Sequence, residues 1–332
     1  METERVLLGH GSGGQLMAEL LADVITPELG ITGPPEDAAL IGLDQVFSTD
    51  SYVVTPRFFP GGDIGSLAVH GTVNDLAMRG ARPIALSLAY IIEEGLPISE
   101  LRDITRSAAA AARAVGVPIV TGDTKVVGRG AADGLYITTT GVGVRLPDAR
   151  PSAAGAAPGD VVLVSGPIGR HGVSILSSRE GLGFEADISS DSQPLHELVA
   201  AMISAGGADV HALRDPTRGG LAGSLNEIAT ASGVCVEIVE SAVPVPAPVA
   251  AACDLLGLDP LHVANEGCLV AFVAAASADA VLEAMRALPE GAETTIIGEV
   301  TRGAPGRVLA HTLVGSSRVV DVLVGEQLPR IC

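Results

Sequence analysis

The sequence is poor in aromatic residues and in lysine. Aromatic side chains make up 2% of the 332 residues, tryptophan is absent, and Lys125 is the only lysine beside nineteen arginines. Long apolar runs are also missing, because the longest, residues 85–92, has the length of a buried strand and not of a membrane span. The first residues are acidic and lack a signal-peptide pattern. We therefore expect a cytoplasmic protein without a membrane segment.

Cysteine is scarce, and its spacing excludes two kinds of site. The four cysteines, Cys235, Cys253, Cys268 and Cys332, form no CxxC pair, so the sequence indicates neither a zinc site nor a disulfide framework. We expect Cys235 and Cys268 to be core residues. Cys332 is different, because it follows Pro329 at the last position of the sequence, where chain ends are usually exposed. A thiol there is placed to be modified or carried into a pocket, unless the position is a matter of chance.

Clusters of basic residues are absent as well. The net charge is −19, which argues against binding to nucleic acids or anionic membranes. An acidic protein that binds an anion needs metal ions, backbone N–H groups or a few well-placed cations. A coding preference for arginine explains most of the surface but not the one lysine. Since lysine is a compact point charge, we expect Lys125 to have a role in a site.

The pattern of apolar residues predicts two α+β domains and not one doubly wound sheet. We expect a first domain over residues 1–150, a second over 151–322, and a mobile tail over 323–332. In the first domain we expect helices over 16–25, 64–78 and 99–115, the last with Ser99 as its N-cap, and strands over 38–41, 46–54, 84–92, 118–120 and 135–144. In the second we expect helices over 172–178, 195–205, 221–231, 247–256 and 277–288, and strands over 160–166, 235–239, 268–274, 295–299 and 308–314.

Four aspartates stand at the ends of elements in the first half: Asp37, Asp50, Asp75 and Asp123. One such aspartate is usually a turn former or a helix cap, but four in one domain favour a hard cation. Mg²⁺ takes oxygen ligands, typically carboxylates together with phosphate oxygens. Bridging metal ions would also let this acidic protein hold a polyphosphate. Lys125 would then reach a phosphate or a reacting carbonyl.

Three further stretches are candidate parts of a site. The glycine-rich loop 10–15 precedes a helical pattern and offers N–H groups to a phosphate, although a flexible turn reads equally well. Residues 214–221 begin a helix, and Arg218 with the exposed N–H groups would bind an anion, whereas an Asp-Pro turn is the plain alternative. Glu266 lies in a turn between apolar segments, where it is either a solvated residue or, if burial raises its pKa, a general base.

Several motifs resemble the aminoimidazole ribonucleotide synthetase-like ATPase superfamily, and within it the HypE family of hydrogenase maturation factors. The superfamily signatures lie at residues 74–83, 122–124 and 215–221. The features that select the HypE family are His10-Gly11-Ser12-Gly13-Gly14, Gly122-Asp123-Thr124-Lys125-Val126-Val127, Asn265-Glu266-Gly267 and Pro329-Arg330-Ile331-Cys332. The resemblance covers essentially the whole chain. It implies two domains with mixed sheets, helices packed on them, and dimerisation through the N-terminal domain.

The resemblance also implies an activity. In this family a carbamoyltransferase, HypF, loads the terminal cysteine, and the loaded thiocarbamate is dehydrated with ATP to a thiocyanate by oxygen phosphorylation and elimination. The cyanide passes to iron on the HypC–HypD complex for [NiFe]-hydrogenase. By resemblance, Cys332, Glu266 and Lys125 are catalytic, and Asp37, Asp50, Asp75 and Asp123 hold Mg²⁺. The implied ATP-binding residues are His10, Gly11, Ser12, Gly13, Gly14, Asp50, Asn74, Asp75, Asp123, Thr124, Arg218, Gly219 and Gly220.

Two other kinds of protein compete with this interpretation. Selenophosphate synthetase and thiamine-monophosphate kinase resemble the same superfamily, but the former normally carries cysteine or selenocysteine in the glycine-rich loop. No cysteine precedes Cys235 here, and neither enzyme accounts for Cys332. A non-catalytic scaffold that only docks maturation partners would need neither the aspartates nor Lys125.

Overall fold

The first half of the chain is built around one mixed sheet. The computed structural model describes residues 5–11, 13–180, 188–325 and 331–332. The sheet has the strand order β1-β2-β8-β5-β6, with β7 also paired to β5. Its strands are β1 (Ala39–Ile41), β2 (Gln45–Tyr52), β5 (Ala81–Glu93), β6 (Ile119–Thr121), β7 (Thr124–Val127) and β8 (Leu135–Arg145). Pairing is antiparallel except that β6 and β7 run parallel to β5.

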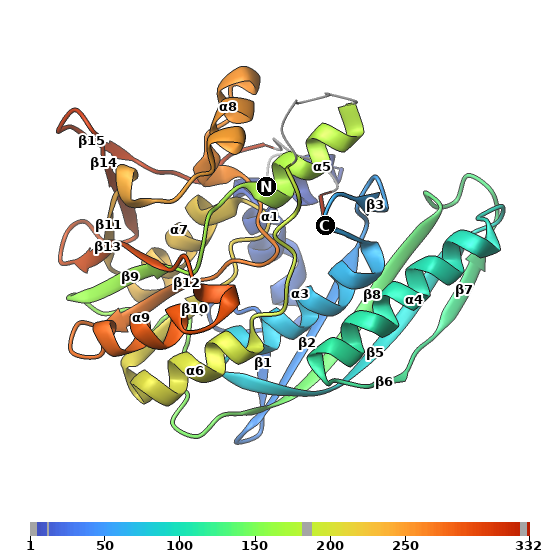
Figure 1. Cartoon of the computed structure of the whole chain (residues 1–332), viewed down its shortest axis with the longest axis horizontal. Coiled ribbons are helices and arrows are strands. Elements are labelled where there is room, and N and C mark those ends of the chain that lie inside the picture. The colour runs from blue at the N-terminus through green and yellow to red at the C-terminus, as the bar shows by residue number, and fades with distance from the viewer. Residues whose placement is uncertain (1–4, 12, 181–187, 326–330) are drawn as a thin grey trace.

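Two helices, α3 (Ile64–Met78) and α4 (Ile98–Val115), cover one face of this sheet (Figure 1). A capping box begins α3, because Asp63 accepts hydrogen bonds from the N–H groups of Gly65 and Ser66 while Ser66 Oγ accepts from Asp63 N–H. Most of α3 is buried, including the polar residues Thr72 and Asn74. This burial fixes the residues of α3 in the interior of the molecule.

Short elements complete the first half. Before the sheet come η1 (Leu8–Gly11), α1 (Gln15–Leu20), the π-helical η2 (Leu21–Ile25) and α2 (Thr26–Leu29), and a small hairpin pairs β3 (Phe58–Phe59) with β4 (Gly62–Asp63). The outer face of the main sheet is different, since it leaves apolar side chains exposed. These include Phe47, Ile84, Ile91, Val142 and Val144.

The second half contains a seven-stranded mixed sheet of order β10-β12-β9-β13-β11-β14-β15. Its strands are β9 (Asp160–Val164), β10 (Val210–Arg214), β11 (Cys235–Val239), β12 (Val270–Ala274), β13 (Thr295–Thr301), β14 (Arg307–His311) and β15 (Ser317–Val319). Its helices are α5 (Arg170–Glu180), α6 (His196–Gly206), α7 (Gly220–Ser232), α8 (Ala247–Leu256) and α9 (Ala278–Arg286). Short turns η3 (Gly207–Asp209), η4 (Glu240–Ala242), η5 (Pro260–His262) and η6 (Pro289–Gly291) connect them.

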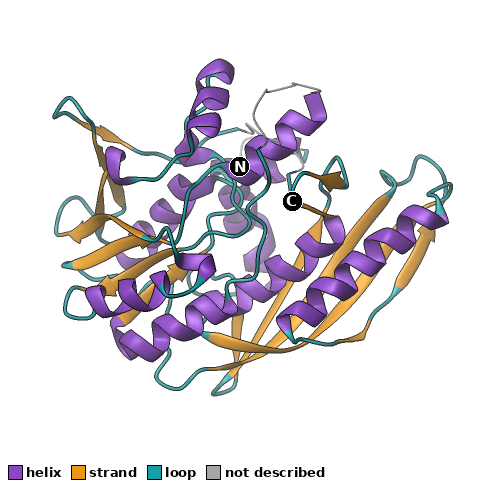
Figure 2. Cartoon of the chain, viewed as in Figure 1, coloured by secondary structure: helices purple, strands orange, loops and turns teal. Residues whose placement is uncertain are grey.

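Helices pack on both faces of the second sheet (Figure 2). Two adjacent residues of β9 show this, because successive side chains of a strand point to opposite faces of the sheet. Val162 belongs to a core shared with Leu221 of α7, whereas Leu163 belongs to one shared with Leu198 of α6. None of the described helices is long and apolar enough to cross a membrane.

The predicted α+β architecture with mixed sheets is confirmed. The bounds predicted for 64–78, 235–239 and 247–256 agree with α3, β11 and α8. The N-cap predicted at Ser99 is wrong, because α4 begins after Pro97 and no side chain caps it. The helix predicted over 16–25 divides into α1 and the π-helical η2. Strands β7 and β10 were not predicted, and β10 matters for the site described next.

Candidate active site

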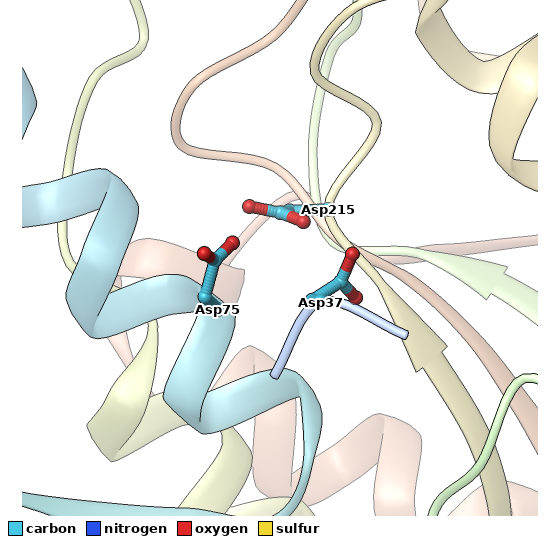
Figure 3. A group of neighbouring side chains, drawn as sticks. All are labelled: Asp37, Asp75 and Asp215. Carbon is cyan, nitrogen blue, oxygen red and sulfur yellow. The ribbon is translucent and has the colours of Figure 1, made fainter. Parts of the chain in front are cut away.

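Three carboxyl groups from different elements meet at the junction of the two halves. Asp37 precedes β1, Asp75 lies in α3, and Asp215 directly follows β10. Each offers one oxygen, and these oxygens all lie within 4.8 Å of one another. Figure 3 shows the three side chains converging on a common space. We call these three residues the carboxylate group.

Burial and mutual repulsion make the carboxylate group hard to ionise without a cation. Burial raises the pKa of Asp37 and of Asp75 well above the ordinary value, and nearby acidic residues raise both further. Burial also raises the pKa of Asp215, to about 6, although the positive charge of Arg214 opposes this. A site with these properties favours either protons or a bound cation.

Neighbouring side chains orient the carboxylate group. Arg214 Nε lies 3.1 Å from Asp37 Oδ1, and the same guanidinium forms an ion pair with Glu227. Ser48 Oγ donates a hydrogen bond to Asp75 Oδ2 at 2.5 Å. The two oxygens of Asp37 and Asp75 that receive these contacts are therefore held in place, and each carboxyl group keeps a second oxygen for a ligand.

The carboxylate group lines a pocket of about 260 Å³ between the two halves. Four residues of its lining are central to the chemistry considered below: Asp50, Arg218, Glu266 and Cys332. The remaining lining residues are Gly13, Met17, Thr49, Gly71, Arg214, Thr217, Ser224 and Glu227. Acidic side chains outnumber arginines in this lining, so a polyphosphate could enter only together with cations.

Glu266 is the most isolated acidic side chain of the pocket. It is 3% exposed, and its Oε1 has no hydrogen-bond partner among the described residues. Burial raises its pKa well above the ordinary value, and the charges of Asp215 and Asp191 raise it further. The turn that carries it is held by Asp191, whose Oδ2 accepts hydrogen bonds from the N–H groups of Glu266 at 3.2 Å and Gly267 at 3.0 Å. Glu266 is thus a buried carboxyl group on a fixed turn, and its raised pKa makes it a stronger base than an exposed glutamate.

Cys332 lines the pocket and is half-buried. Its main-chain oxygen accepts a hydrogen bond from Val53 N–H at 3.1 Å, and the preceding residue, Ile331, is buried in the core of the first half. Burial raises the pKa of the Cys332 thiol to about 12, although Arg218 opposes this. The same thiol is the largest influence that raises the pKa of Arg218. The structure therefore brings Cys332 into the same site as Glu266.

Comparison with known proteins decides the family. The AIR synthase related protein family matches in two parts, its N-terminal domain over residues 35–145 and its C-terminal domain over 157–310. The carbamoyl dehydratase HypE of Azotobacter vinelandii is 56% identical over 328 residues, which is 97% of this chain and 96% of that protein.

This chain belongs to the HypE family of carbamoyl dehydratases. Solved structures agree with the assignment. A crystal structure of a HypE–HypF complex matches with a TM-score of 0.87 and 45% identity, covering 93% of this chain and all of that one. A crystal structure of HypE in complex with ATP matches with a TM-score of 0.84 and 47% identity, covering 99% and 100%. Membership of the HypE family, an enzyme family, sets aside the synthetase, kinase and scaffold interpretations.

The glycine-rich loop of this HypE family member contacts the start of α7. Gly13 has a φ of +74°, and a Cβ at this position would lie 2.7 Å from Arg218 Cβ. His10 and Gly11 belong to η1, and Gly14 is the N-cap residue of α1. None of these three lines the pocket, and Ser12 lies outside the described residues. Their role in binding a nucleotide stays a prediction.

Two glycines form the entry to α7 beside Arg218. Gly219 and Gly220 have φ values of +82° and +62°. A Cβ at Gly220 would lie 2.6 Å from Leu261 O. Glycine is therefore required at this position both by the positive φ and by this close approach. This entry places Arg218 in the pocket lining, together with Thr217 before α7 and Ser224 within it. The anion-binding role predicted for these residues is consistent with their placement and stays a prediction.

Some predicted site residues lie elsewhere in the chain. Lys125 and Asp123 form an exposed ion pair, with 2.6 Å between Nζ and Oδ2, next to Thr124 at the start of β7, and none of the three lines the pocket. Asn74 is buried and its amide is fully used: it donates to Gln193 O and Glu266 O and accepts from Leu195 N–H. Asn74 therefore joins the two halves behind the site instead of lining it.

Asp215 is the carboxylate that sequence reasoning did not assign to a metal site. The rule applied to Asp50 and Asp123, an aspartate directly after a strand, applies equally to Asp215, which follows β10. The rule could not be used because β10, Val-His-Ala-Leu-Arg, is short and contains two basic residues. Recognising that strand would have placed Asp215 beside Asp37 and Asp75.

Proposed function

We propose that this chain uses ATP to dehydrate a carbamoyl group carried by its own Cys332, and so converts a thiocarbamate to a thiocyanate. The observation that carries the proposal is the position of Cys332, which lines one pocket together with Glu266 and the carboxylate group. A terminal-segment cysteine serving only to fill the core would not need these neighbours. The crystal structure of a related HypE with ATP supports nucleotide binding by this fold.

Magnesium fits the carboxylate group. All three donors are carboxylate oxygens from Asp37, Asp75 and Asp215, the ligand type that Mg²⁺ prefers. Burial and repulsion raise their pKa values, so a bound divalent cation would relieve an unfavourable arrangement. We propose that these residues hold Mg²⁺, with Asp50 lining the pocket beside them. When bound, the metal neutralises charge on the phosphates of ATP.

The proposed reaction removes one water from S–C(=O)–NH₂. The carbamoyl oxygen attacks the γ-phosphorus of ATP, ADP leaves, and the nitrogen loses one proton. The phosphorylated oxygen then leaves as phosphate while the nitrogen loses its second proton, which forms the C≡N bond. Phosphorylation is needed because an amide oxygen is a poor leaving group. One thiocarbamate and one ATP thus give one thiocyanate, ADP, phosphate and a proton.

Two residues of the pocket have direct roles in this scheme. Glu266 takes a proton from the carbamoyl nitrogen, because burial and neighbouring acidic residues raise its pKa and its Oε1 has no hydrogen-bond partner among the described residues. Arg218 lies close enough to Cys332 and Glu266 for their charges to shift its pKa upward. Its guanidinium therefore stabilises negative charge that develops on the carbamoyl oxygen or the transferred phosphoryl group.

We further propose HypF as the donor of the carbamoyl group and the HypC–HypD complex as the acceptor of cyanide for the iron of [NiFe]-hydrogenase, in the cytoplasm. The crystal structure of a HypE–HypF complex supports the first partner. The second rests on membership of the HypE family. Since Cys332 must reach a donor, the pocket and an acceptor, we also propose that Cys332 leaves the pocket between steps on a mobile tail, the segment 323–332, of which residues 326–330 lie outside the described residues. The outward state is favoured without ATP and the inward state with it.

We propose that two copies pair through the outer face of the first sheet. Its exposed apolar side chains include Ile84 and Val142 on strands β5 and β8, and such a face favours burial against a partner. Lys125 lies in β7 of the same sheet but outside the pocket of its own chain. We therefore propose that Lys125 acts in the pocket of the second copy.

Two experiments test these proposals. Carbamoylated protein given Mg²⁺ and ATP is expected to release one phosphate per chain in a single turnover, and Cys332→Ala is expected to release none above background. Mixed dimers test Lys125: Lys125→Ala and Glu266→Gln chains, each inactive alone, are expected to regain activity when they exchange subunits. Absence of any regained activity in verified mixed dimers would exclude a role of Lys125 in the second copy.

A further inference from the structure

His171 connects the second half of the chain to the segment that ends in Cys332. It lies in the first turn of α5 and is fully buried. Its Nε2 lies 2.6 Å from the main-chain oxygen of Ile331, and its Nδ1 lies 2.8 Å from Ser190 Oγ. The proposed chemistry assigns no role to His171, yet both of its ring nitrogens are used.

The hydrogen bonds fix which nitrogen of His171 carries the proton. A carbonyl oxygen only accepts, so Nε2 must donate to Ile331 O. Nδ1 then accepts, and the Ser190 hydroxyl must donate to it. Ser190 Oγ in turn accepts from Ser192 N–H at 3.1 Å. Burial lowers the pKa of His171 to about 4, so at neutral pH the ring is uncharged and held in this one tautomer.

The ring of His171 is also held by packing. Phe59 contacts it edge-on, with ring centroids 5.5 Å apart and an angle of 90° between the planes. The segment bearing Ser190 is tied to the same hairpin, because Ser190 N–H donates to Pro60 O at 2.8 Å. The donor that meets Ile331 is therefore fixed in position and direction before the segment arrives.

Two successive main-chain oxygens of the segment are bound, one by each half of the chain. His171, from the second half, binds Ile331 O, and Val53 N–H, from the first half, binds Cys332 O. Ile331 is 5% exposed and packs with Tyr52 in the core of the first half. With both main-chain oxygens bound, the Cys332 residue lines the pocket.

We propose that His171, oriented by Ser190, is a positioning residue that binds the Ile331 carbonyl and aligns the Cys332 sulfur for dehydration. This proposal rests on the proposed function, since it names the device that presents the carbamoylated thiol to Glu266. His171 itself touches none of the reacting atoms. Its removal leaves the thiol chemically intact but loosely held, so loading of the carbamoyl group in solution is unaffected while dehydration in the pocket is slowed.

The test compares variants that separate the hydrogen bond from the packing. His171→Met keeps the volume but lacks the donor, His171→Gln restores an N–H donor at similar reach, and Ser190→Ala removes the group that selects the tautomer. His70→Met is the matched control, because His70 bonds through Nδ1 to Ser192 Oγ at 3.1 Å and has no described contact with Ile331 or Cys332. Thermal unfolding of each variant establishes that it is folded.

Two rates are measured for each variant. One is single-turnover dehydration of enzymatically carbamoylated protein, followed by mass spectrometry of the Cys332 peptide. The other is alkylation of uncarbamoylated Cys332 by iodoacetamide, measured with Mg²⁺ and a non-hydrolysable ATP analogue present so that the inserted state is favoured. We expect His171→Met to dehydrate about 10- to 100-fold more slowly and to be alkylated correspondingly faster, because a buried carbonyl loses its donor. His171→Gln should recover most of both rates, Ser190→Ala should lie between, and His70→Met should match the unaltered chain.

Distinct results would overturn the proposal. It is wrong if folded His171→Met dehydrates and is alkylated at the unaltered rates, or if His171→Gln is as defective as His171→Met. Should His171→Met fail to fold, Ser190→Ala decides, and unaltered rates in that variant refute the alignment. Failure of the unaltered chain to dehydrate Cys332 would refute the proposed function instead, while the alkylation rates would still test the contact between His171 and Ile331.

Discussion

Replacing Asp215 by asparagine should stabilise the protein in the absence of metal, which is the reverse of the usual effect of altering a buried polar residue. The reason is the crowding of Asp215 with Asp37 and Asp75, whose oxygens lie within 4.8 Å. Asparagine has nearly the same shape but cannot ionise. The substitution therefore removes one negative charge from three buried carboxylates that repel one another, while the side-chain volume stays nearly the same.

The magnitude follows from the pKa of Asp215, which burial raises to about 6 from about 3.9 in an unfolded chain. A raised pKa contributes stability that is present below about pH 4 and is lost as the pH rises through about 6. Above pH 6 the ionised Asp215 therefore costs about 3 kcal/mol, since one pKa unit corresponds to about 1.4 kcal/mol. Asp215→Asn should raise the free energy of unfolding by about 2 to 3 kcal/mol at pH 8 and by little at pH 4.

The assay is urea unfolding at pH 4, 6 and 8, followed by circular dichroism because the chain has no tryptophan. Each series is repeated with Mg²⁺, which should stabilise the unaltered chain at pH 8, less at pH 6, and should stabilise Asp215→Asn less at every pH. Asp254→Asn, an exposed residue of α8, is the control. The reasoning is refuted if Asp215→Asn is less stable than the unaltered chain at pH 8 without metal, or if its gain from Mg²⁺ is unchanged.

Three other predictions concern single residues. Glu266→Gln should slow dehydration about 10²- to 10⁴-fold, as loss of a general base does, while the rate of carbamoyl loading stays unchanged. The control variant Glu237→Gln should dehydrate at the unaltered rate. A normal single-turnover rate of Glu266→Gln would exclude Glu266 from the chemistry. Gly13→Ala should weaken ATP binding about tenfold in calorimetry, because residue 13 has a φ of +74° and an added Cβ would lie 2.7 Å from Arg218 Cβ, which forces the loop away from α7. The control is Gly11→Ala, which should bind ATP normally because a Cβ there would meet nothing within 4 Å. Equal affinities of the two variants would contradict the role of the loop. Asn74→Ala should lower the free energy of unfolding by about 1–3 kcal/mol, since buried groups at Gln193 and Leu195 lose their partner, and a change below about 0.5 kcal/mol would show that this link between the halves is not needed.

The sequence predicted the architecture well because local signals and packing agree there. Residues 64–78 are mostly small or apolar and begin with a capping box at Asp63 and Ser66, so helix bounds, burial and structure coincide in α3. The pattern fails where a signal is weak. Ser99 has the right side chain for an N-cap, yet the helix begins at Ile98, and Pro97, two residues before Ser99, takes the N-cap position.

The candidate site was predicted in part. Asp37, Asp50, Asp75, Glu266 and Cys332 carry signals that are visible in the sequence, namely expected element ends, a turn between apolar segments and an unusual position, and the structure gathers them in one pocket. The position expected for Asp50, directly after a strand, was wrong, because Asp50 lies within β2. Other members depend on tertiary packing. Asn74 was expected at the ligand, but only the fold shows that its amide is used by Gln193, Leu195 and Glu266.

His171 illustrates the limit of sequence reasoning most clearly. Nothing in the stretch Gly169-Arg170-His171-Gly172 distinguishes a buried histidine from an exposed one. Its partner Ile331 is 160 residues away along the chain, and the contact exists only because α5 and the segment ending in Cys332 meet at the junction of the two halves. Pairings at such separations are set by the fold as a whole.

Mass spectrometry of the Cys332 peptide tests the central claim most directly. The chain is first incubated with HypF and its substrates, and then with Mg²⁺ and ATP. We predict that Cys332 first gains the mass of one carbamoyl group and then loses one water, and that this loss requires ATP and Glu266. A carbamoyl adduct that persists with ATP, or its absence from Cys332, would contradict the account.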